Sequence, residues 1–176
     1  MDANALLIDA IGRPLQAARA VLRDLDADAF TTLVQGPVGR GNSIAWLVWH
    51  AARQQDAQMA DLSGAQQQWV TGGWAERLGV SRGPGSMGFG DTEQQVADLH
   101  VSDPADLLAY VTAVTDASVE YLRGLSSDDL AEVVDHNWTP PVTRGVRIIS
   151  VIDDATAHVA QAEYARGLLT DWSIGY

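Results

Sequence analysis

Cysteine and lysine are both absent from this chain of 176 residues. Without cysteine there is no disulfide framework, no thiolate nucleophile and no cysteine-based zinc knuckle. The 11 basic residues are all arginine and are outnumbered by 23 acidic residues, which gives a formal net charge of -12. Because phosphate binding needs clustered basic side chains, this balance argues against a nucleic-acid surface.

Long apolar runs are missing as well, and no segment is long enough to span a bilayer. The first residues, Met1 to Asn4, lack the basic and apolar regions of a signal peptide. We therefore expect a cytoplasmic protein without a membrane partner. The chain length predicts one domain covering residues 1–176, with enough mass for a real core.

Apolar residues recur at helical spacing in four long segments, over about residues 3–25, 43–62, 102–125 and 146–170. Residues 65–79 are expected to hold a short helix. The glycine-rich residues 81–90 and the proline-containing residues 135–144 are expected as loops. No strand-like alternation of useful length occurs. The pattern predicts an all-α fold, a four-helix bundle with a long crossover between its second and third helices.

Three side chains form a candidate metal site. Asp154 and His158 stand four residues apart in the last predicted helix and point the same way, and His50 lies on the apolar margin of the second. Two imidazoles and a carboxylate suit a divalent metal such as zinc, nickel or iron and leave coordination positions open. Alternatively, Asp154 forms an ion pair with Arg147 or Arg166, and His158 is a hydrogen-bonded core residue.

Tryptophan is frequent, with six residues in the chain. Core packing accounts for most of them. Trp49 and Trp74 are also candidates to line an apolar pocket above the metal, together with Met87 and Phe89 from the glycine-rich segment.

Two polar residues of the last predicted helix are further candidates. Gln161 is placed to orient a ligand, or else to form a hydrogen bond in the core. Arg166 lies two turns beyond His158 and is a candidate to bind a substrate carboxylate, the alternative being an ion pair with an acidic neighbour.

Two segments carry a resemblance to a known family. The segment 43–56, with His50, resembles the second helix of DinB-like metal-binding bundles, and the segment 145–167 resembles their last helix. The likeness extends to the loop from Trp138 and to the segment from Thr71 to Trp74. In that family, a His-xxx-His-x-Gly-Gln pattern joins a histidine of the second helix to bind a divalent metal. Here Asp154 replaces the first of these histidines, and Ala160 replaces the glycine.

The resemblance, which includes the metal-binding domain of mycothiol-dependent maleylpyruvate isomerase, implies a function. It implies a zinc or nickel enzyme, a homodimer, in which a small thiol such as mycothiol attacks a small electrophilic substrate. The alternative is a non-enzymatic dimeric bundle with a weak or vestigial metal site and a role in stress. The four apolar helix faces serve either function equally well.

Overall fold

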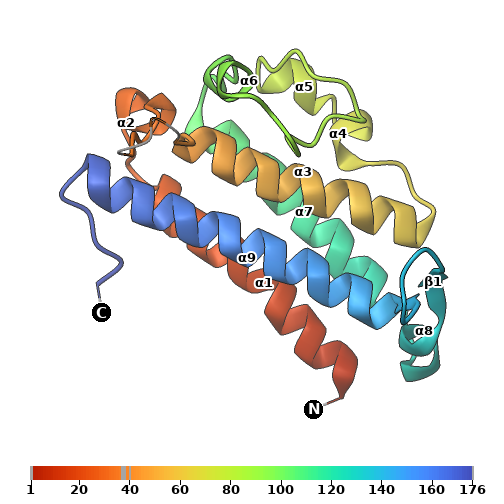
Figure 1. The fold of residues 1–176 in the computed structure, drawn as a ribbon. Coiled ribbons are helices and arrows are strands. Elements are labelled where there is room, and N and C mark those ends of the chain that lie inside the picture. Colours follow the sequence, from red (N-terminus) through yellow and green to blue (C-terminus); the bar gives the residue numbers. More distant parts are fainter. Residues whose placement is uncertain (1, 37–38, 40, 176) are drawn as a thin grey trace.

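Four long helices form a bundle in the computed structural model, which describes residues 2–36, 39 and 41–175 (Figure 1). They are α1 (Ala3–Leu22), α3 (Ile44–Ser63), α7 (Pro104–Arg123) and α9 (Arg144–Leu169). The expected all-α fold is confirmed, and the predicted helix boundaries agree with the observed ones to within a few residues. Within the described ranges, none of the helices combines the length and apolar character that a membrane span requires.

The two helices that carry the candidate ligands begin at side-chain caps. The Ser43 hydroxyl accepts a hydrogen bond from the Trp46 amide at 3.1 Å and starts α3. The Thr143 hydroxyl accepts one from the Val146 amide at 3.4 Å and starts α9. Both bonds satisfy an amide that a helix leaves unpaired in its first turn. Gly64, with φ +71°, ends α3 in the left-handed conformation that glycine adopts most easily.

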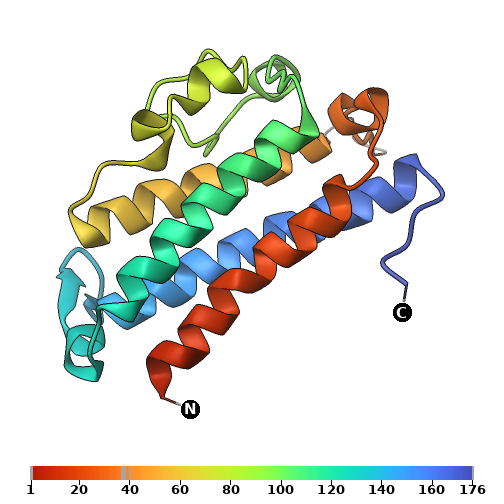
Figure 2. The same ribbon diagram turned by 180° about the vertical axis from the view of Figure 1, so that it is seen from behind.

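The bundle has a fixed order around its axis. Helix α3 packs against α7 and α9, and α1 packs against the same two helices from the other side (Figures 1 and 2). Helices α3 and α7 run in the same direction because the long connection between them carries the chain back along the bundle, whereas α1 and α9 run the opposite way. As a result, α3 and α9 are antiparallel neighbours.

The connection between α3 and α7 is the predicted crossover. It contains the short helices α4 (Gln68–Thr71), α5 (Trp74–Arg77) and α6 (Glu93–Ala97). The expected short helix over 65–79 is thus divided in two, because Gly73 has φ +61° and interrupts it. Residues 81–90 form turns and irregular chain, as predicted.

Smaller elements close the ends of the bundle. Helix α2 (Ala27–Thr31) follows α1, and α8 (Ser127–Ala131) follows α7. Strands β1 (Val133–Asp135) and β2 (Val142–Thr143) then pair in an antiparallel hairpin before α9. The segment 135–144 was expected to be only a loop. Its ends lie in strands that are too short to show the alternation by which a strand is recognised.

The core has two parts. The larger apolar cluster lies beneath the crossover and includes Trp46, Trp49, Trp69 and Trp74. The smaller cluster lies nearer the hairpin and contains Leu7, Ile11, Met59, Leu122, Ile148 and Val151. Packing of tryptophan in the core is therefore confirmed for these four residues, and the aromatic cluster beneath the crossover borders the candidate ligand His50 on α3.

Candidate metal centre

The structure brings the three predicted ligands together between α3 and α9. One ligand atom from each of His50, Asp154 and His158 lies within 4.8 Å of the other two. The two imidazole rings are 4.4 Å apart between centroids and almost perpendicular, at 89°. His158 Nε2 lies 3.6 Å from Asp154 Oδ1. Three donors from two helices thus converge on one point.

The cluster is buried on one side and open on the other. His50, in the second turn of α3, is only 5% exposed. The side chains of Asp154 and His158 are 35% and 21% exposed. A small molecule can therefore approach the cluster from the α9 side, while the α3 side is closed by protein.

Unpaired polar atoms support a metal at this position. Asp154 Oδ2 and His158 Nδ1 are buried and have no hydrogen-bond partner within the described residues. A buried polar atom without a partner costs about 1–3 kcal/mol, so such atoms are rare unless a ligand satisfies them. A carboxylate oxygen and an imidazole nitrogen without partners, beside a second imidazole, match the donor types that bind divalent metals.

His50 is held in a neutral, oriented state. Its Nδ1–H donates to the Met87 carbonyl oxygen, and its ring stacks on Trp46 with centroids 4.8 Å apart and planes at 7°. Burial lowers the pKa of His50; the hydrogen bond to Met87 opposes this shift, and the neighbouring His158 adds to it. The neutral imidazole is the form that binds metal, so the environment favours the competent state.

Asp154 is held in its charged state. Burial alone raises its pKa, but the interactions of the carboxylate with His158 and Gln54, together with the charges of His158 and His50, outweigh that effect, and the net shift is downward. The carboxylate is therefore ionised at neutral pH and can neutralise part of the charge of a cation.

Gln54 is a further polar neighbour of the cluster, in addition to the residues predicted from the sequence. It is 6% exposed and stands one turn beyond His50, so α3 and α9 each contribute two polar side chains at i, i+4. Gln54 accepts a hydrogen bond from Gln58, which in turn accepts one from Arg147 at 3.4 Å. Its four-residue spacing from His50 is the sequence signal that could have identified it.

Asp154 does not form the ion pair with Arg147 or Arg166 that was the alternative to metal binding. Arg147 forms its ion pair with Asp135, at 2.7 Å. Arg166 donates from Nη1 to the carbonyl oxygens of Ala20 and Val21, at 3.0 and 2.8 Å. Both arginines that were considered as partners of Asp154 are thus bound elsewhere.

The other four residues predicted for the site are not part of the three-donor cluster. Trp49 is fully buried, edge-on to Trp69. Trp74 packs against Tyr110 beneath the crossover. Gln161 is exposed on α9, and Arg166 contacts the end of α1.

The glycine-rich segment contributes through its backbone. Met87 reaches the site through its carbonyl group, which binds His50. Phe89 is 92% exposed and so forms no pocket wall in this structure.

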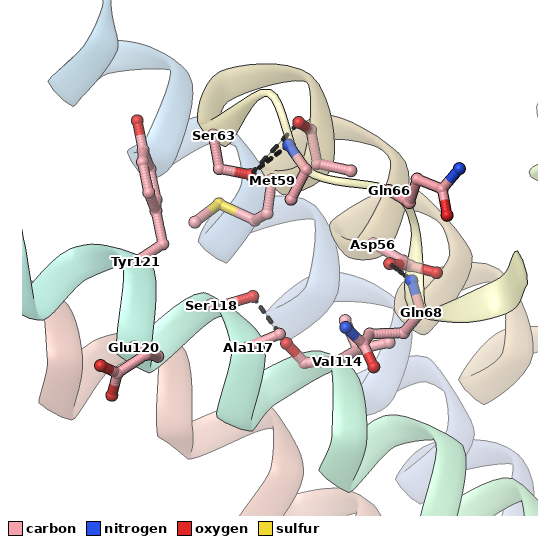
Figure 3. A pocket seen from close by; sticks show the side chains of 12 residues that line it. Asp56, Met59, Ser63, Gln66, Gln68, Val114, Ala117, Ser118, Glu120 and Tyr121 are labelled. Atoms are coloured by element: carbon pink, nitrogen blue, oxygen red, sulfur yellow. Dashed lines mark hydrogen bonds between the residues drawn. The ribbon is translucent and has the colours of Figure 1, made fainter. Parts of the chain in front are cut away.

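A separate hollow of about 350 Å³ lies between α3 and α7 (Figure 3). Met59, Val114 and Tyr121 are among the residues that line it. The carboxylate of Asp56 at its edge already accepts hydrogen bonds from two backbone amides, at 2.7 and 2.8 Å, and Ser118 is bound by Gln55. The side chains of Asp56 and Ser118 are thus satisfied from within the protein, unlike Asp154 Oδ2 and His158 Nδ1.

Comparisons with known proteins agree with this architecture. The model of the DinB superfamily matches residues 10–162. A crystal structure titled as a conserved protein of locus from Enterococcus faecalis is 30% identical, with a TM-score of 0.86, covering 96% of this chain and 98% of that one. No curated protein matches the sequence. The chain belongs to the DinB superfamily.

Proposed function

We propose that this protein binds one divalent metal ion, zinc or nickel, through His50, Asp154 and His158. The proposal depends on the convergence of three donor atoms from two helices, which lie within 4.8 Å of one another. Two buried atoms of the same side chains, Asp154 Oδ2 and His158 Nδ1, add support because they have no partner in the described part of the chain. Two imidazoles and one carboxylate match the preferences of these metals. Three protein ligands leave a coordination position open to a small molecule.

We further propose that the site serves a thiol-dependent transfer or isomerisation on a small electrophilic substrate. A divalent ion bound there would lower the pKa of a thiol and so supply a nucleophile at neutral pH. The chain has no cysteine, so the thiol must come from outside, and a low-molecular-weight thiol of the mycothiol type fits this need.

The residues around the site have clear roles in this proposal. Trp46 covers one face of the His50 ring and keeps water from it. Asp154 and His158 lie at the exposed side, so thiol and substrate would enter there. Gln54, buried one turn beyond His50, favours the charged form of Asp154.

Thiol titration of cobalt-loaded protein tests the proposal. We expect a saturable sulfur-to-metal absorption band with the wild-type protein, and loss of the band in His158→Ala. His100→Ala is the matched control, because His100 is an exposed histidine outside the cluster and its variant should retain the band. A cobalt-loaded protein that responds to no cellular thiol would instead support the non-enzymatic bundle.

A further inference from the structure

One segment of the crossover, Ser86–Asp91, lies directly on α3 at the metal centre, and both of its ends are anchored. At its start, the Ser86 carbonyl accepts a hydrogen bond from Arg53 Nε at 3.2 Å. At its end, the Asp91 carboxylate accepts hydrogen bonds from Trp46 Nε1 at 2.9 Å and from Arg82 Nη1 at 2.7 Å. We call Ser86–Asp91 the clamp segment.

Gly88 is the point of closest approach between the clamp segment and α3. It is buried and has φ +90°, a conformation that other residues rarely adopt. A Cβ atom there would lie 3.0 Å from a ring carbon of Trp49 and 3.1 Å from both Trp46 and His50 Nδ1. Any side chain at this position would therefore push the clamp segment away from the His50 ring.

This close approach determines which nitrogen of His50 carries the proton. A carbonyl oxygen can only accept, so the contact between Met87 and Nδ1 requires a proton on Nδ1. A neutral imidazole carries one ring proton, which leaves Nε2 with a free lone pair. Metal-binding histidines are commonly oriented in this way by a second partner.

We infer that Gly88 and the Met87 carbonyl are positioning elements: by lying on α3, the clamp segment fixes His50 in the Nδ1–H tautomer that leaves Nε2 available to the metal. The inference deepens the proposed metal function and rests on it. It assigns a role to a crossover segment that contributes no ligand side chain of its own.

Gly88→Ala tests the inference, with Gly83→Ala as its matched control. Gly83 is an exposed glycine just outside the clamp segment, and a Cβ there meets open space. Nitrogen NMR of the metal-free protein reports the tautomer of His50, whose signals are assigned by their loss in His50→Gln. We expect the Nδ1–H form in the wild type and in Gly83→Ala, and a mixture of tautomers in Gly88→Ala. Zinc affinity, measured by chelator competition, should fall at least about tenfold in Gly88→Ala only.

Asp91→Ala provides a second variant should Gly88→Ala not fold. It removes the anchor to Trp46 and Arg82 without adding an atom near His50, and should shift the tautomer and the zinc affinity in the same direction with unchanged helix content. A folded variant of either kind with wild-type tautomer and affinity would overturn the inference. A wild-type protein that shows the Nδ1–H form but binds no metal would contradict the proposed function alone, because the tautomer is measured without metal.

Discussion

At the scale of single residues, Arg53 is a buried charge with several hydrogen-bond partners. Its side chain is fully buried. One nitrogen donates to Asp56 at 3.2 Å and to the Tyr110 hydroxyl at 3.1 Å, and another donates to Gln67 and Pro84. Burial and the nearby Asp56 raise the pKa of Tyr110, so its hydroxyl stays protonated. This network fastens the crossover to the bundle.

Arg53→Met should therefore destabilise the protein strongly. The substitution leaves the Asp56 carboxylate buried without its cation, which typically costs about 3–5 kcal/mol. Urea denaturation measures the loss of stability. Arg123→Met is the control, because the pair of Arg123 with Glu120 is exposed, and we expect a change within about 0.5 kcal/mol. Equal effects of the two variants would contradict this interpretation.

His50 should make the metal-free protein sensitive to acid. Its pKa is lowered in the folded state, so below the ordinary value of 6.5 the unfolded chain binds more protons at this site than the folded one. Stability should fall as the pH drops through 6.5 towards the folded pKa. His50→Gln should lack this part of the pH dependence. Urea midpoints at pH 7.5 and 5.5, measured with a chelator present, test it, and identical pH dependence in the two proteins would refute it.

Residues differ in how well the sequence predicts their part in the site. His50, Asp154 and His158 could be proposed because helical spacing and residue chemistry are both visible in the sequence. Gly88 and Met87 act through backbone position, which depends on the path of the crossover across α3 and leaves no chemical pattern in the sequence.

At the scale of elements, helix length decides what can be predicted. The long helices show several turns of apolar periodicity and start at recognisable caps such as Ser43 and Thr143. Helices α2, α6 and α8 have five residues each, so they span too few turns for a periodic signal. The two strands of the β hairpin are shorter still, with three and two residues. The elements that carry the candidate ligands are thus the ones that sequence periodicity identifies best.

Arg166→Met tests how α9 is joined to α1. The guanidinium binds carbonyl oxygens near the end of α1 and lies 4.8 Å from the Trp172 ring centroid. Losing these contacts leaves buried carbonyl groups unpaired, and we expect a cost of about 1–3 kcal/mol in urea denaturation. Metal affinity should stay at the wild-type value. Unchanged stability with weakened binding of an anionic substrate would favour the substrate-binding role considered from the sequence.

At the scale of the whole molecule, the topology places the candidate site between α3 and α9. The crossover makes α3 and α7 parallel and covers α3 on the side away from α9 (Figures 1 and 2). The sequence predicts that such a crossover exists. The position of the crossover on the bundle depends on contacts such as those of Arg53 and Asp91. These contacts join residues more than thirty positions apart in the sequence.

We expect the protein to form a homodimer through the exposed face of α9. Val146, Ile149, Tyr164 and Leu168 are between 54% and 72% exposed and lie on one face of that helix. Light scattering after gel filtration should give twice the chain mass of 18.8 kDa. Tyr164→Glu should halve this mass, whereas Leu6→Glu, at an exposed apolar residue of α1, should not. A wild-type mass of one chain at micromolar concentration would exclude the dimer.

Elemental analysis of the untagged protein shows whether α3 and α9 hold a metal ion. We expect about one zinc or nickel ion per wild-type chain. We expect almost none in His50→Ala and His158→Ala, and the wild-type amount in His100→Ala. A wild-type protein without stoichiometric metal, or cluster variants that retain it in full, would contradict the claim that α3 and α9 share a metal ion.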